Sequence, residues 1–176
     1  MGQEQLNNII LVGFMGTGKS TVGAMLAQEL GWEVVDVDAE IVKSEGRAIS
    51  DIFETEGEAA FRAIETTMLE KLLADKRKLL IATGGGAVLA ERNRELMMQH
   101  GLVVALLATA EQIVERVKHD TGRPLLQGDV TERVKLLMEQ RKHAYDFAPV
   151  AIDTTAKSAA DVAAEIVKCL EMRVQQ

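Results

Sequence analysis

Eight consecutive residues near the N-terminus have the spacing of a phosphate-binding loop. Gly13 to Ser20 reads G-F-M-G-T-G-K-S, which fits the pattern G-x-x-x-x-G-K-[ST]. Its glycines let successive backbone N–H groups face phosphate oxygens, and the start of a following helix adds partial positive charge. Lys19 would contact the β and γ phosphates and Ser20 would bind Mg²⁺. We expect a nucleotide-binding segment made of Gly13, Met15, Gly16, Thr17, Gly18, Lys19, Ser20 and Thr21, with Lys19 catalytic.

A pair of carboxylates follows the next apolar run. Asp36 and Asp38 stand two residues apart after Val34-Val35. If this run is a strand, side chains two apart share one face, so both carboxylates would point at the same place. One could hold Mg²⁺, which prefers hard oxygen ligands, while the other accepts a proton from an attacking hydroxyl. The alternative is an acidic helix start, which is common.

These features suit either a phosphotransferase or a nucleotide-controlled switch. A GTPase would need an N-K-x-D stretch to read guanine, and the sequence has none. The third apolar run ends in Gly84, Gly85 and Gly86, where a larger ATPase motor often has an acid. Three adjacent glycines are poor in any regular element, so they form a flexible turn or let a substrate approach the backbone. A small kinase with an acceptor pocket is the better interpretation.

Two arginines are candidates to bind a substrate carboxylate. Arg62 and Glu65 are neighbours on a predicted helix, either as a solvated ion pair or as an arginine held in place to grip a carboxylate with its planar fork. Phe61 beside them is expected to pack within the substrate region without a chemical role. Arg141, followed by Tyr145 one turn later, is the second candidate clamp.

Two further arginines are candidates for the nucleotide end of the site. Arg123 lies in a polar loop, either as a plain surface residue or as a mobile group that closes over the phosphates. Arg116, seven residues earlier, would lie at a helix end beside the nucleotide.

The elements that must position these residues alternate along the chain. The apolar runs predict strands, and amphipathic stretches between them predict helices. This alternation implies a parallel sheet with helices on both faces, a three-layer α/β/α fold whose ligands bind beyond the carboxyl ends of the strands. The strands are expected at 9–12, 34–37, 79–82, 102–107 and 150–152, and the helices at 20–30, 39–45, 59–74, 91–99, 111–118, 131–144 and 159–170.

Composition narrows the class of protein. The 176 residues, 47% of them hydrophobic, suit one globular domain, and a net charge of −7 with few aromatic residues argues against nucleic-acid binding. Neither an apolar run long enough to span a membrane nor a secretory signal is evident. Cys169, the single cysteine, excludes an internal disulfide. We expect a cytoplasmic protein, and the lack of a long heptad pattern favours a monomer.

Taken in order, the motifs resemble those of the shikimate kinase family. They are Gly13–Ser20, the D-x-D pair, G-R-A-I-S-D-I-F from Gly46, G-E-A-A-F-R-A-I-E from Gly57, Gly84–Gly86, R-P-L-L from Arg123, and Arg141 to Tyr145. The resemblance runs from about Asn8 to about Leu170. It implies a fold like the nucleoside monophosphate kinases: a five-stranded parallel core in one domain over residues 1–176, a substrate-binding region at about 36–65 and a mobile lid at about 115–128.

The resemblance also implies an activity and residue roles. The activity is ATP- and Mg²⁺-dependent phosphorylation of the 3-hydroxyl of shikimate, giving shikimate 3-phosphate and ADP in aromatic amino acid biosynthesis. Ser20 and Asp36 would serve the metal, Asp38 would hold substrate hydroxyls and act as base, and Arg123 would be a catalytic lid residue. Shikimate would lie against Asp38, Phe61, Arg62, Glu65, Gly84, Gly85, Gly86 and Arg141, and adenine between Arg116 and Asp153, Thr154, Thr155 and Ala156.

One departure and two alternatives remain. The family often has R-x-P-L-Y where this chain has Arg141-Lys142-His143-Ala144-Tyr145, which affects the expected aim of Arg141. A gluconate-type sugar-acid kinase of the same fold would also phosphorylate a hydroxylated carboxylate. A catalytically idle nucleotide-binding module is the alternative outside enzymes.

Overall fold

The core of the molecule is a parallel sheet of five strands. The computed structural model describes residues 8–119, 126 and 128–175. Its strands lie in the order β2-β3-β1-β4-β5, so β1 is central, with Leu11 paired to Ala82 on one side and to Val104 on the other. The strands are β1 (Asn8–Gly13), β2 (Glu33–Asp36), β3 (Leu79–Ala82), β4 (Leu102–Leu107) and β5 (Val150–Asp153).

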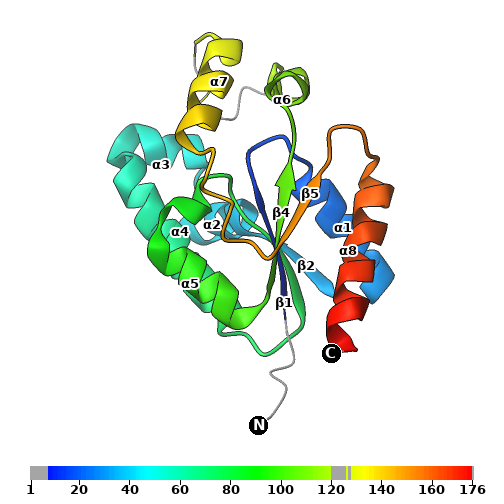
Figure 1. Cartoon of the computed structure of the whole chain (residues 1–176). Helices are drawn as coiled ribbons and strands as arrows, with labels where there is room; N and C mark the ends of the chain where they lie inside the picture. Colours follow the sequence, from blue (N-terminus) through cyan, green and yellow to red (C-terminus); the bar gives the residue numbers. More distant parts are fainter. Residues whose placement is uncertain (1–7, 120–125, 127, 176) are drawn as a thin grey trace.

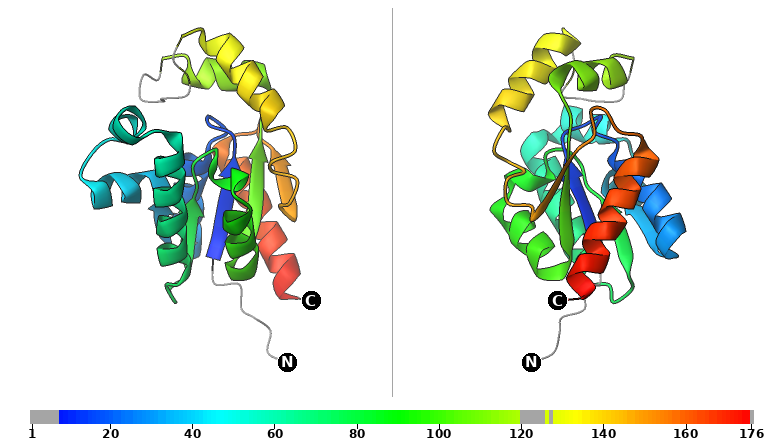
Figure 2. Two further views of the ribbon diagram at one scale, coloured as in Figure 1. Left: turned by 90° about the vertical axis from the view of Figure 1, so that its left-hand side faces the viewer. Right: turned by 45° about the vertical axis from the view of Figure 1, so that its right-hand side comes forward.

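Helices cover both faces of the sheet and its carboxyl edge (Figure 1). One face carries α1 (Lys19–Leu30) and α8 (Ala159–Val174), which pack against each other. The other side carries α2 (Val37–Glu45), α3 (Ile49–Glu56), α4 (Glu58–Leu73), the short turn η1 (Ala87–Leu89) and α5 (Glu91–His100). Figure 2 shows α6 (Ala110–Val117) and α7 (Val130–Gln140) above the carboxyl ends of the strands.

The pleat of the central strands divides the apolar core into two clusters. Ile10 of β1 points into the cluster under α4 and α5, and Leu11 points into the cluster under α1 and α8. Every residue of β1 and β3 is buried, as expected for parallel strands covered on both faces. The three-layer α/β/α fold predicted from the sequence is confirmed.

Three local expectations were wrong. Val37 begins a helix instead of ending a strand, because Asp36 is the N-cap of α2 and its side chain accepts a hydrogen bond from the Ala39 N–H. Helix α3 was not expected, because only eight residues lie between the caps at Ala48 and Gly57. The helix expected to reach Ala144 ends at Gln140.

The central position of β1 places the phosphate loop in the crevice of the sheet. The chain leaves β1, adds β2 and β3 on one side and then adds β4 and β5 on the other. Loops at such a reversal leave a crevice at the carboxyl ends, where ligands of open α/β sheets bind. No helix among the described residues is both long and apolar enough to cross a membrane.

Candidate active site

The phosphate loop connects β1 to α1 with a sharply turned backbone. Gly16 and Gly18 have φ of 75° and 93°, a conformation that residues with a Cβ rarely adopt, and Gly18 caps α1. The Lys19 ammonium is buried and donates hydrogen bonds of 2.8 Å to the carbonyl oxygens of Gly13 and Phe14. These bonds hold the lysine inside the curve of the loop, beside the N-terminus of α1, where an anion is favoured.

One end of the loop is bordered by Arg116 and by the residues after β5. Nη1 of Arg116 donates to the Gly16 carbonyl at 2.8 Å, and the same nitrogen lies 3.5 Å from the Thr154 hydroxyl. Thr154 is buried and donates to the Leu107 carbonyl at 2.9 Å, which ties β5 to the end of β4. The N–H of Thr155 donates to Asp153, and this bond lowers the pKa of the Asp153 carboxyl. The sequence-predicted nucleotide residues from α6 and β5 thus meet at the loop.

Two hard oxygen donors meet beside the start of α1. The Ser20 hydroxyl donates to Oδ2 of Asp36 at 2.8 Å. Hydroxyl and carboxylate oxygens fit Mg²⁺, which keeps several waters and uses few protein ligands when phosphates supply the rest. The described residues hold no cluster of three or more His, Cys, Asp or Glu suited to a metal ion. The donor set therefore fits a metal shared with a nucleotide better than a closed metal site.

A cleft of about 400 Å³ joins these parts to the segment after β3. Both Asp36 and Asp38 line it, although Asp38 does so from the first turn of α2 and not from a strand. Two loop residues predicted to bind nucleotide, Met15 and Thr21, also line it, whereas the buried Thr17 hydroxyl donates back to the Phe14 carbonyl. The lining residues are Met15, Gly16, Gly18, Lys19, Ser20, Thr21, Asp36, Asp38, Thr83, Gly84, Gly85 and Arg116.

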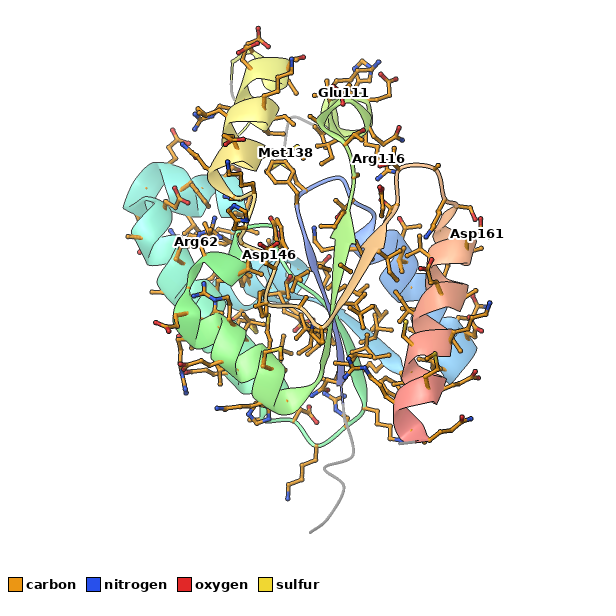
Figure 3. All side chains as sticks on the ribbon, viewed as in Figure 1. Arg62, Glu111, Arg116, Met138, Asp146 and Asp161 are labelled. Atoms are coloured by element: carbon orange, nitrogen blue, oxygen red, sulfur yellow. The ribbon has the colours of Figure 1, made fainter. Side chains whose placement is uncertain are left out.

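Gly84–Gly86, the glycine segment after β3, must lack side chains at two positions because charged side chains lie close to its backbone. A Cβ on Gly84 would lie 3.0 Å from both Oδ1 of Asp38 and Oε2 of Glu65. A Cβ on Gly86 would overlap the guanidinium of Arg62. Three charged side chains from α2 and α4 therefore approach this backbone directly. In Figure 3, Arg62 lies on the left of the molecule beside α4 and α5, and Arg116 lies at the upper right beside α6.

Glu65 is a fully buried carboxylate that holds Arg62. Nη1 of Arg62 donates to Oε1 of Glu65 at 3.0 Å, and the Arg62 guanidinium lies 5.2 Å from the Phe61 ring centroid. Burial, with a smaller contribution from the negative charge of Asp38, raises the pKa of Glu65 to about 7 against the opposing charge and hydrogen bond of Arg62. Phe61 is buried against Phe53, so its role here is packing. The pair is thus a built contact and not a solvated one.

Arg141 enters from the end of α7. Its side chain is buried, its guanidinium lies 5.8 Å from the Phe14 ring centroid, and its positive charge acts on Glu65. Nη1 of Arg141 is buried without a hydrogen-bond partner among the described residues. The Tyr145 hydroxyl donates to the Gly85 carbonyl at 2.7 Å, and burial raises the Tyr145 pKa to about 12. The tyrosine of the R-x-x-x-Y motif therefore fastens the residues after α7 to the glycine segment.

Two residues of this site, Thr83 and Glu58, had no role assigned from the sequence. A third, Arg123, had a predicted role but lies outside the described residues. Thr83 lines the cleft while its buried hydroxyl donates to the Leu11 carbonyl at 2.9 Å. Glu58 lies 3.3 Å from Nη2 of Arg62, a contact that its spacing of four residues could have revealed. Arg123, the predicted lid arginine, lies outside the described residues, as does most of R-P-L-L.

Comparisons with known proteins agree on one family. Residues 15–171 match the family model described as shikimate kinase. A shikimate kinase of Geobacter metallireducens is 46% identical over 171 residues, covering 97% of this chain and 95% of that protein. The structure of an Acinetobacter baumannii shikimate kinase in complex with shikimate is 41% identical, with a TM-score of 0.91 over 97% of this chain and 96% of that one.

A gluconokinase structure shares only the fold. The enzyme from Sinorhizobium meliloti is 19% identical, with a TM-score of 0.55 over 97% of this chain and 99% of that one. At this identity the likeness carries no argument about substrate.

Proposed function

The chain belongs to the shikimate kinase family, and we propose that it transfers the γ-phosphoryl group of ATP to the 3-hydroxyl of shikimate, giving shikimate 3-phosphate and ADP. The observation that supports this best is the junction at Gly84–Gly86. There Asp38, Glu65 and Arg62 approach a glycine segment whose residues Gly84 and Gly85 line the same cleft as the phosphate loop. An acceptor with a carboxylate and neighbouring hydroxyls suits that junction.

The phosphate loop positions ATP. Lys19 and the backbone N–H groups of the loop bind the β and γ phosphates, and Arg116 with residues Asp153 to Thr155 borders the adenine end. Phosphoryl transfer needs alignment and charge neutralisation more than covalent chemistry from the protein. Arg123, from the lid region at about 115–128, is proposed to neutralise charge on the transferring group.

Ser20 and Asp36 would hold Mg²⁺ when the nucleotide is bound. The ion supplies charge neutralisation at the phosphate oxygens. The Asp36 carboxylate already bonds both the Ser20 hydroxyl and the Ala39 N–H, so α1 and α2 keep the two oxygens together.

The acceptor is held by groups from three elements. Arg62 on α4 and Arg141 after α7 grip the carboxylate of shikimate, because guanidinium donors match carboxylate geometry. Asp38 on α2 accepts hydrogen bonds from the ring hydroxyls and takes the proton of the attacking 3-hydroxyl. Glu65 holds Arg62 in place by accepting a hydrogen bond from its Nη1 at 3.0 Å.

A coupled ADP-release assay with shikimate, gluconate and nucleoside monophosphates tests this function. We expect release with shikimate only, and none in Lys19→Ala, which keeps the fold. Asp38→Asn should bind ATP but lose turnover. Release with gluconate and not shikimate would favour the sugar-acid kinase alternative, and release with none of the acceptors would favour an idle nucleotide-binding module.

A further inference from the structure

Arg62 is held by a second carboxylate that the roles above do not use. Glu58, the first residue of α4, lies one helical turn before Arg62 and approaches Nη2 at 3.3 Å. Glu65 accepts a hydrogen bond from Nη1 at 3.0 Å. The remaining nitrogen, Nε, is buried and has no hydrogen-bond partner within the described part of the chain. Two of the three guanidinium nitrogens are therefore engaged by residues of the same helix.

Nη2 is the nitrogen that a substrate carboxylate must share. A guanidinium grips a carboxylate through two parallel N–H donors, either from Nη1 and Nη2 or from Nε and Nη2. Both edges include Nη2, which Glu58 approaches. Nη2 has two N–H donors, one on each edge, so a two-pronged grip either takes the donor that Glu58 uses or brings a second carboxylate to the same nitrogen, where the two negative charges repel.

Glu58 and Glu65 differ in how easily each can give up its contact with Arg62. The Glu65 side chain is 0% exposed, so it cannot exchange its arginine for water, whereas the Glu58 side chain is 49% exposed. Asp38 adds a further negative charge beside Glu65. An arriving carboxylate would be the fourth anion near Arg62 and Arg141, and Glu58 is the one of these that can return to solvent at little cost.

We propose that Glu58 is an internal competitor for the substrate carboxylate: it occupies Nη2 of Arg62 in the free enzyme and is displaced when substrate binds. This inference rests on the proposed function. Glu58 thereby sets how strongly an acceptor carboxylate must bind Arg62, and it weakens substrate binding without touching the reacting atoms. An exposed ion pair is worth about 0 to 1 kcal/mol, so its removal should change KM by no more than about fivefold.

The test compares steady-state kinetics of the full-length chain with shikimate as varied substrate and ATP saturating. Glu58→Gln should lower the KM for shikimate about two- to fivefold, with kcat and the KM for ATP unchanged. Glu70→Gln is a matched control, because Glu70 lies on the same helix, is 46% exposed and pairs with Arg92 at the same 3.3 Å. The control should leave all three constants at their wild-type values.

Glu58→Asp separates contact from net charge. It keeps the charge but shortens the side chain by one methylene, so it should also lower the KM for shikimate. A raised or unchanged KM in Glu58→Gln would overturn the competitor role, and so would a wild-type KM in Glu58→Asp. Wild-type turnover reports separately on the proposed function: without ADP release from shikimate, that function fails and the competitor role fails with it.

Discussion

The charges of Arg62, Arg141 and Asp38 all act on the buried Glu65 carboxylate, and the balance among these four side chains bears on what can bind beside them. Burial raises the pKa of Glu65 to about 7, and the positive charges of Arg62 and Arg141 oppose this effect of burial. An arginine in this setting is held in one orientation and keeps donors for a second carboxylate. At the scale of single residues, this arrangement supports the proposed carboxylate clamp beside the phosphate loop.

Arg141→Lys removes the planar fork but keeps the charge. We expect the KM for shikimate to rise about tenfold or more, because a two-pronged charged hydrogen bond is worth about 1.5 to 3 kcal/mol. The KM for ATP should stay within about twofold of wild type. Steady-state kinetics with each substrate varied in turn measures both constants. An unchanged KM for shikimate would remove Arg141 from the clamp and point to the departure at Lys142-His143-Ala144.

Glu65→Gln should change how stability depends on pH. The folded-state pKa of Glu65 is raised from 4.5 to about 7, so the stabilisation from its protonated form is full below about pH 4.5 and is lost as pH rises through about 7. Glutamine does not titrate. The free energy of unfolding of wild type should therefore fall relative to the variant by about 3 kcal/mol across this window.

Urea unfolding of wild type and Glu65→Gln at about pH 5 and about pH 8 measures this difference. Parallel pH profiles of the two proteins would show that Glu65 titrates normally and that its burial has no energetic consequence.

Most residues of the site lie where a helix or strand begins or ends. Asp36 ends β2 and caps α2, Gly18 caps α1, and Arg141 follows the last turn of α7. Only Arg62 and Glu65 act from inside a helix, where a spacing of three residues aligns them. The residues of the site thus depend on where each helix begins or ends, which is the feature that sequence patterns predict least well.

That dependence explains which parts of the site could be predicted. The phosphate loop was predictable, because its spacing and its place after a buried run identify it without tertiary information. Asp36 and Asp38 were expected to lie together because they would share one face of a strand. They do line the same cleft, but Asp38 belongs to α2, which begins at Val37. The bond from Tyr145 to Gly85 spans 60 residues, and the contact of Asp38 with Gly84 depends on packing between α2 and the sheet. No local pattern contains such contacts.

Tyr145→Phe tests the hydrogen bond that links the residues after α7 to the backbone of Gly85. Its 2.7 Å hydrogen bond to the Gly85 carbonyl is lost while the ring is kept. We expect a loss of about 1 kcal/mol in the free energy of unfolding and a higher KM for shikimate, with the KM for ATP unchanged. Chemical denaturation and kinetics on the same preparation measure both. Equal effects on the two KM values would mean that the bond supports the fold generally and not the acceptor end.

The whole molecule carries a net charge of −7, yet four of its described basic residues, Lys19, Arg62, Arg116 and Arg141, border the site. Four carboxylates, those of Asp36, Asp38, Glu58 and Glu65, border it as well, so the described charges at the site balance and the acidic excess lies elsewhere. Two anionic ligands, a nucleoside triphosphate and a carboxylate, would otherwise be repelled by a chain of this charge. The predictions of a monomer and of a cytoplasmic location belong to this scale and stay predictions. Sedimentation of the purified chain tests the first, with 19.2 kDa expected.

Ionic strength should act on substrate capture more than on turnover. Because the positive charges of Arg62 and Arg141 attract the anionic acceptor, kcat/KM for shikimate should fall several-fold as salt rises from about 10 mM to about 300 mM. The value of kcat should change little, since screening weakens long-range attraction and not contacts inside the cleft. A kcat/KM that rises with salt would indicate that the negative charge of the whole chain dominates at the site.

The central claim concerns which atom receives the phosphoryl group, and the most direct measurement is phosphorus–proton correlation NMR on the product formed from ATP, Mg²⁺ and shikimate. We predict one new phosphate ester whose phosphorus couples to the proton on C3 of the ring, absent when Lys19→Ala replaces the wild-type protein. A phosphate on another hydroxyl, or no ester at all with the folded wild-type chain, would contradict the account.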